Sequence, residues 1–169
     1  MNIQPFLEAS TAVQVHVAGG ALAFVLGGYL LARRKGGPIH RALGKVWIAT
    51  MVIISLSAFF INELRVWGPF SPLHVFAVVT PISCWWAVRM ARRRNRKAHG
   101  QTVICLYLGG IVVAGGVTFV PGRLMHEVFL EGTGADSPYA DWIMSPYWLP
   151  FGLALAAAAL AWLWHPSPR

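Results

Sequence analysis

Charged residues are scarce in this sequence. Lysine, arginine, aspartate and glutamate together make up 12% of its 169 residues, and only six residues are acidic. Soluble domains carry about 25% charged residues, which keep their surface polar. Because 56% of the chain is hydrophobic, a soluble domain of this size could not bury its apolar side chains. The composition excludes a soluble protein and indicates a chain embedded in a lipid bilayer.

Cysteine is also rare, and the two that occur, Cys84 and Cys105, lie inside apolar runs. Two isolated cysteines provide neither a disulfide framework nor the paired spacing of a zinc site. The sequence contains no CxxCH motif, which excludes covalent attachment of a c-type haem. The first residues lack the basic segment and the cleavage site of a signal peptide, so we expect no cleaved leader.

Long apolar runs, in contrast, recur along the chain. A helix needs roughly 20 apolar residues to cross a bilayer. About five runs approach this length, and the predicted spans cover residues 12–32, 43–61, 73–88, 102–120 and 147–164. Residues 121–145 form the longest loop, marked by glycine and proline. The predicted fold is an all-α, polytopic membrane helix bundle, a single transmembrane domain over residues 1–169.

The basic residues predict the orientation of this bundle, because lysine and arginine concentrate in cytoplasmic loops. Placing the N-terminus outside and the C-terminus inside puts all lysines and arginines but Arg65 and Arg123 in the cytoplasm. The net charge of +8 therefore lies at the ends of apolar runs. This distribution argues against a nucleic-acid partner and favours the bacterial cytoplasmic membrane.

The histidines form the clearest functional pattern. His16 and His74 lie near the outer ends of the first and third predicted spans, and His40 and His99 lie at the inner starts of the second and fourth. A single histidine at a span end can simply face interfacial water. An ionisable group within a span, such as His16, is a candidate functional residue. One histidine per span, alternating between outer and inner ends, favours a shared role.

Two histidines from facing helices can ligate a porphyrin iron from both sides, and helix bundles build such sites in their cores. Gly20 lies one turn after His16, and Gly44 lies one turn after His40. At these positions the missing side chains would leave room for a macrocycle. The alternative explanation for the many glycines is that small residues let neighbouring helices pack closely.

Haem propionates are anionic and need cations nearby. Arg41, Lys45 and the run ARRRNRK would supply them at the inner side, and Arg65 or Arg123 at the outer side. Two irons at these two levels would together cross most of a ~30 Å hydrocarbon core. The pattern predicts a haem iron held by His16 and His74 and a second held by His40 and His99.

Short motifs in the same order, HVAGG, KGGPIHRALGK, FSPLH and PGR, resemble a family of bacterial membrane proteins of unknown function. The arrangement of one histidine per helix resembles the di-haem cytochrome b561 superfamily. The resemblance covers about residues 14–123. Classical members of the superfamily have six helices, whereas this chain has about five predicted spans, with the four haem-bearing helices (about 12–120) first.

The resemblance implies two non-covalent b haems and electron transfer across the membrane. Electrons would pass from a quinol or another small reductant on one side of the membrane to an acceptor on the other side. A bound quinone is therefore a further expected ligand. A homodimer or a redox partner protein is compatible with such a role. The sequence identifies neither the donor nor the acceptor.

An alternative of another class uses the same histidines. Imidazole also binds zinc and copper, and proton relays use histidines within the membrane. The chain could therefore be a histidine-dependent transporter of metal ions or protons. The predicted spans contain no aspartate or glutamate, although hard cations prefer carboxylate ligands. The sequence favours the electron-transfer hypothesis over this transporter hypothesis.

Overall fold

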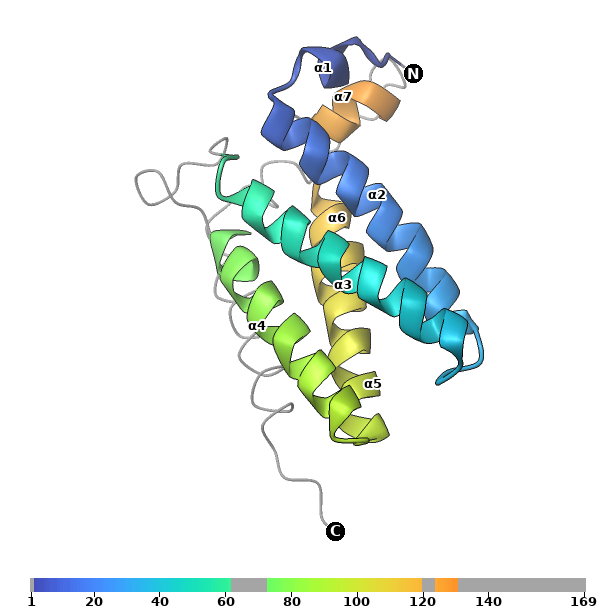
Figure 1. Ribbon diagram of the computed structural model, residues 1–169. Coiled ribbons are helices and arrows are strands. Elements are labelled where there is room, and N and C mark those ends of the chain that lie inside the picture. Colours follow the sequence, from blue (N-terminus) through green and yellow to red (C-terminus); the bar gives the residue numbers. More distant parts are fainter. Residues whose placement is uncertain (1, 62–72, 120–123, 131–169) are drawn as a thin grey trace.

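The computed structural model describes residues 2–61, 73–119 and 124–130. Within these ranges every regular element is a helix (Figure 1). Four long rods run alternately up and down. Three of them are α2 (Thr11–Ala32), α3 (Pro38–Ala58) and α4 (Leu73–Arg92). The fourth rod is built end to end from α5 (Arg96–Cys105), the π-helix η1 (Leu106–Val113) and α6 (Ala114–Val117).

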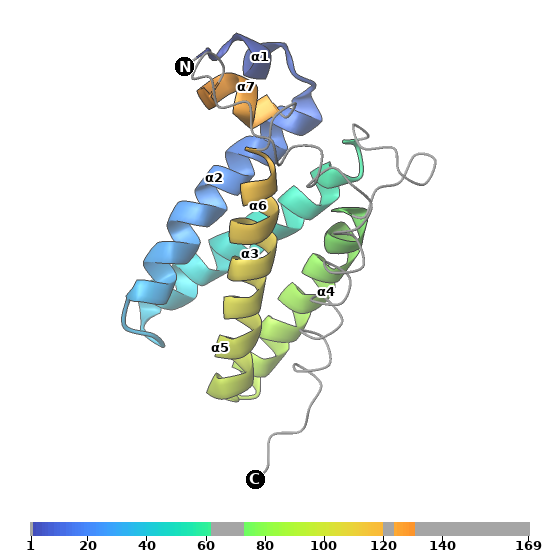
Figure 2. The same ribbon diagram turned by 180° about the vertical axis from the view of Figure 1, so that it is seen from behind.

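The four rods form a ring. The main helix contacts join α2 to α3, α3 to α4, α4 to α5 and η1, and η1 back to α2. Figure 2 shows the fourth rod in front of α3, with α2 and α4 on either side. In this ring α2 lies diagonally opposite α4, and α3 lies diagonally opposite the fourth rod. Residues that face the bundle axis can therefore meet across these two diagonals.

The protein is a membrane protein with transmembrane helices. Among the described residues, three helices are long and apolar enough to cross a membrane: Thr11–Ala32, Pro38–Ala58 and Arg96–Gly116. The second begins five residues before the predicted span at 43, because Pro38 occupies its first turn. The fourth rod likewise begins at Arg96, ahead of the predicted 102.

The predicted third span corresponds to α4, which is not among these three helices. Its 20 residues include Pro81 and end in arginines. It nevertheless packs between α3 and the fourth rod as a full member of the ring. The predicted fifth span at 147–164 lies outside the described residues.

Two tight turns bring the ends of neighbouring rods together. Between α2 and α3, Gly36 adopts φ +91°, a conformation that glycine accepts without steric cost. Between α4 and α5, Arg94 adopts the left-handed region at φ +57°. The Asn95 N–H donates to Met90 O at 3.0 Å and the Arg94 N–H donates to Ala91 O at 3.1 Å, a Schellman turn. The Asn95 side chain then caps α5 by accepting from Ala98 N–H at 3.0 Å.

Close approach of the rods depends on Gly27, in the middle of α2. A Cβ atom at this position would lie 2.6 Å from the ring of Tyr107 and 2.7 Å from Trp47 Nε1. The Trp47 indole donates to Ala23 O at 2.9 Å, and the Tyr107 hydroxyl donates to Phe24 O at 3.1 Å. Side chains from α3 and η1 thus meet on one small residue of α2, as small residues allow in membrane bundles.

A short helical cap covers one end of the bundle. It consists of α1 (Gln4–Glu8) and α7 (Leu124–Leu130), which pack against each other (Figure 1). The predicted outer loop at 121–145 therefore contains the helix α7, in which Met125 and Val128 are buried. The Gln14 side chain lies within 3.3 Å of three backbone carbonyls at the end of α1 and joins the cap to α2.

Candidate functional site

The structure brings His40 and His99 together across one diagonal of the ring. His40 is in the first turn of α3, and His99 is in the first turn of α5. Their ring centroids lie 6.5 Å apart, and the ring planes are nearly perpendicular at 84°. We refer to the part of the bundle that carries these residues as the His40 end.

This separation matches the spacing of two imidazoles bound to one metal from opposite sides. A bond from a metal to imidazole is about 2.0–2.1 Å long, and adding the ring radius on each side puts the centroids roughly 6.3 Å apart. Direct packing of aromatic rings also occurs at centroid distances of roughly 4.5–7 Å. The distance alone therefore permits either arrangement, and the surroundings of each ring nitrogen must be considered.

The His99 ring is held by a backbone carbonyl of α4. Its Nδ1 lies 2.9 Å from Ala87 O, and a carbonyl can only accept a hydrogen bond. The proton of a neutral His99 is therefore on Nδ1, and the lone pair is on Nε2. Ligand histidines typically use one ring nitrogen in this way, which fixes the tautomer and the orientation of the other. The tight turn at Arg94 and Asn95 positions α5 for this contact.

His40 has a different environment. Its Nδ1 is buried and has no hydrogen-bond partner among the described residues. Buried polar nitrogens nearly always have a partner, so an orphaned one points to an absent ion, water or cofactor. The Nδ1 atom of His40 is therefore a candidate ligand atom for a metal or a cofactor.

The cations that share a cavity with His40 come from the turn after α2. Arg33, Arg34 and Lys35, in the turn after α2, line a cavity of about 270 Å³ together with His40. The predicted cations Arg41 and Lys45 are exposed on α3. The signal was present in the sequence, since only four residues separate Lys35 from His40. Their charge predicts the orientation of the bundle, and their place beside His40 becomes visible only in the structure.

The glycines of the His40 end leave open space. A Cβ atom added at Gly44 would have no neighbour within 4 Å, and the same holds at Gly100, which directly follows His99. Gly44 was predicted to provide clearance, whereas Gly100 was not singled out. Both glycines thus leave space beside the helices that carry His40 and His99.

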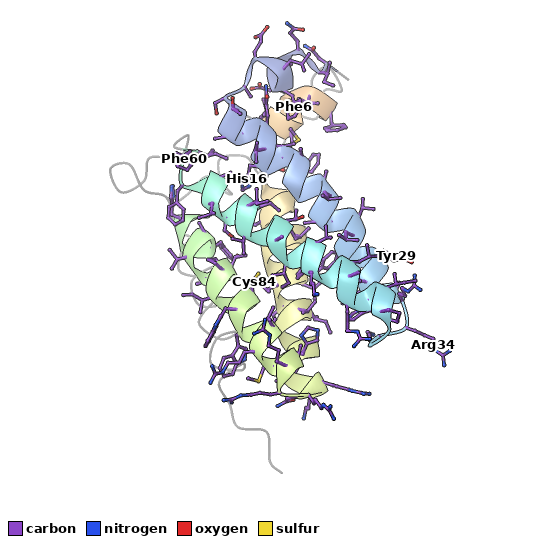
Figure 3. The ribbon with its side chains drawn as sticks, in the orientation of Figure 1. Phe6, His16, Tyr29, Arg34, Phe60 and Cys84 are labelled. Atoms are coloured by element: carbon purple, nitrogen blue, oxygen red, sulfur yellow. The ribbon has the colours of Figure 1, made fainter. Side chains whose placement is uncertain are left out.

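The opposite end of the bundle carries His16 and His74, and we call it the His16 end. Figure 3 places His16 between α2 and α3, on the side of Phe60 and far from Arg34. His16 Nδ1 lies 3.0 Å from Ile54 O and 3.1 Å from Ser57 Oγ. The carbonyl again places the proton on Nδ1, which leaves Nε2 with the lone pair.

His74 lies at the start of α4 and is only 8% exposed. Its ring centroid is 6.0 Å from that of Phe59, at the end of α3. The last turn of α3 therefore contacts both His16 and His74.

The two glycines that follow His16 have different roles. A Cβ atom at Gly19 would lie 2.9 Å from Ile54, so this glycine serves close packing. At Gly20, the predicted clearance residue, an added Cβ would have no neighbour within 4 Å. The packing alternative is therefore confirmed at Gly19, whereas the clearance role of Gly20 stays a prediction.

The two ends are well separated along α3. His40 is 14 residues before Ile54 and 17 before Ser57, which corresponds to roughly 21–26 Å at ~1.5 Å per residue. This separation spans most of a ~30 Å hydrocarbon core.

The remaining candidates are less informative. Arg65, Arg123 and His165 lie outside the described residues. His126 Nδ1 contacts Phe119 O at 3.1 Å and so joins α7 to the end of the fourth rod. Within the described ranges, no group of three or more histidine, cysteine or acidic residues could hold a metal ion.

A family model described as "Predicted membrane protein (DUF2306)" matches residues 13–160. No curated protein and no solved structure matches the chain.

Proposed function

This chain belongs to the DUF2306 family of predicted membrane proteins, and we propose that it is a di-haem b cytochrome that transfers electrons across the membrane. In this proposal five helices span the bacterial cytoplasmic membrane, with the N-terminus outside. His16 and His74 hold the outer haem, and His40 and His99 hold the inner one, as in the cytochrome b561 superfamily.

The observation that carries the proposal is the geometry of the His40–His99 pair. The ring centroids are 6.5 Å apart, His99 is fixed through Nδ1, and the buried His40 Nδ1 lacks a partner in the described part of the chain. A metal held only by side chains commonly needs three or four of them. A porphyrin iron needs only two axial ligands, which agrees better with a pair.

The protein residues have separate tasks in this function. The imidazoles of each pair would hold the cofactor and so set its level within the bundle. The carbonyls of Ala87 and Ile54 orient His99 and His16. Arg33, Arg34 and Lys35 provide positive charge for propionates at the inner end. Haem iron, when bound, supplies one-electron oxidation and reduction, and the donor and acceptor are a quinol or small reductant and a partner on the other side.

Absorption spectra of the purified full chain, oxidised and reduced, test this proposal. We expect a b-type spectrum and two haems per chain. His40→Ala and His99→Ala should each remove about one haem, and His16→Ala and His74→Ala should each remove the other. The matched control is His126→Ala, which removes a histidine that contacts only a backbone carbonyl in the described structure.

Three outcomes would contradict the proposal. A colourless protein that binds zinc or copper would favour the transporter alternative. A haem content unchanged in all four variants would remove the assigned ligands. A loss of haem in the His126→Ala variant equal to that in all the others would indicate general destabilisation. If His126→Ala loses haem while His74→Ala keeps it, the outer pair is His16 with His126 and the assignment of His74 is wrong.

A further inference from the structure

A second cavity lies on the outer face of α4, away from the histidine pairs. Its volume is about 370 Å³, and its lining residues are Trp85, Val88, Arg89, Arg92 and Arg93. Three arginines around one tryptophan make this cavity strongly cationic at its rim and apolar at its wall. The proposed di-haem function gives no role to Trp85, Val88 or Arg89, whereas Arg92 and Arg93 belong to the run ARRRNRK, which the sequence offered as one source of cations for the inner haem.

An apolar track leads along α4 to this cavity. Val78, Ile82 and Trp85 are 49%, 58% and 58% exposed, respectively. Their spacing of four and three residues places them on one face of the helix, and Arg89 and Arg92 continue the same face. The opposite face of α4 carries buried residues, which face the bundle: Ala77, Thr80, Cys84 and Ala87.

One contact lies where the apolar track meets the arginines. The Arg89 guanidinium lies over the Trp85 ring, 5.2 Å from its centroid. A cation stacked on an indole gains stability from the ring, most strongly where water is excluded. Tryptophan also prefers the level of the lipid headgroups. The arginines therefore stand at headgroup level, directly beyond a track at acyl-chain level.

We propose that this cavity and track bind one acidic phospholipid. The headgroup phosphate is held by Arg89, Arg92 and Arg93, since guanidinium binds phosphate through two parallel hydrogen bonds. An acyl chain lies along Val78, Ile82 and Trp85. Basic pockets at the cytoplasmic side of transmembrane helices bind acidic headgroups in this way.

The arrangement favours this ligand over related ones. A free phosphate ion would use the arginines but not the exposed apolar track. A zwitterionic lipid carries a cation beside its phosphate, which three arginines repel. An acidic phospholipid satisfies both parts of the surface.

The test uses the purified full chain in mixed micelles and measures its melting temperature and the lipid retained in native mass spectrometry. Phosphatidylglycerol should raise the melting temperature, with one tightly retained lipid per chain. Phosphatidylcholine and inorganic phosphate should have little effect. The double variant Arg92→Gln, Arg93→Gln should bind phosphatidylglycerol roughly thirtyfold more weakly, because each cation near acidic lipid contributes about fivefold.

The matched control is the double variant Arg33→Gln, Arg34→Gln, which removes the same charge from the other basic cavity. It should retain wild-type affinity for phosphatidylglycerol. Trp85→Ala leaves every arginine in place and should also weaken binding, which keeps the proposal testable if the arginine variant fails to fold. Equal losses in the two arginine variants, unchanged binding in Trp85→Ala, or an equal effect of phosphatidylcholine or phosphate would each overturn the proposal.

Discussion

Replacing Gly27 with alanine should destabilise the bundle, although alanine is the better helix former. A Cβ atom at this position would lie 2.6 Å from Tyr107 Cδ2 and 2.7 Å from Trp47 Nε1. Favourable contacts between heavy atoms need about 3.5–4.0 Å. The new methyl group would therefore overlap its neighbours by roughly 1 Å or more on that scale.

Neither neighbour can move away easily. Trp47 is 2% exposed and its indole N–H is bound to Ala23 O. Tyr107 is bound through its hydroxyl to Phe24 O and stacks on the Phe24 ring at a centroid distance of 6.1 Å. Overpacking of this kind costs about 1–3 kcal/mol. The gain in helix propensity from glycine to alanine offsets up to about 1 kcal/mol.

The expected net effect is a loss of about 1 kcal/mol in the free energy of unfolding, within a range of roughly 0–2 kcal/mol when the propensity gain is subtracted from the overpacking cost. Thermal unfolding of the purified chain in detergent measures it. The control is Gly116→Ala, since an added Cβ there has no neighbour within 4 Å. This control should be neutral or slightly more stable than the wild type.

A double-mutant cycle separates steric overlap from other effects. Tyr107→Ala should remove part of the clash, so its combination with Gly27→Ala should cost less than the sum of the single variants. If Gly27→Ala instead melts at or above the wild-type temperature, as Gly116→Ala is expected to do, the close contact of the three rods at Gly27 is wrong.

Three further predictions concern the turns, the topology and the His16 end. Arg94→Gly should raise the free energy of unfolding by about 1 kcal/mol, since glycine adopts φ +57° without the steric cost that other residues incur; an unchanged or lower melting temperature would contradict this. In chains without native cysteine, an impermeant reagent applied to intact cells should label a cysteine replacing Asn2 and not one replacing Arg34, and the reverse result would invert the topology. Ser57→Ala should weaken haem binding at the His16 end about tenfold in a titration of the apoprotein, because it removes a polar contact of the His16 ring, and a loss as complete as that of His16→Ala would be inconsistent with this supporting role.

Much of the architecture could be predicted from hydrophobicity alone. The predicted first span at 12–32 nearly coincides with α2 (Thr11–Ala32), because the ends of this continuous apolar run are also the ends of the helix. The predicted second span begins at residue 43 because His40 and Arg41 interrupt the apolar pattern. The helix starts at Pro38 nevertheless, because proline fits the first turn of a helix and hydropathy does not register this.

Other features depend on contacts that hydropathy cannot detect. The π-helix at Leu106–Val113 has the same apolar composition as an α-helix, so its wider turns do not change the pattern. The short helix α7 has only seven residues, too few for a clear hydrophobic pattern, and its contact with α1 is visible only in the structure. The sequence also predicted that His40 and His99 lie at one level, but the orphaned Nδ1 of His40 and the carbonyl partner of His99 follow from the crossing of particular helices.

Helix α3 connects the two candidate sites physically. Its first turn carries His40, and its last turns contact His16 through Ile54 and Ser57 and His74 through Phe59. Its middle is fixed by Trp47, which is hydrogen-bonded to Ala23 of α2. A shift of α3 along its axis would therefore change the environment of histidines at both ends at once. The register that Gly27 and Trp47 impose at the centre of the bundle thus determines the geometry of both histidine pairs, which lie roughly 21–26 Å apart along this helix.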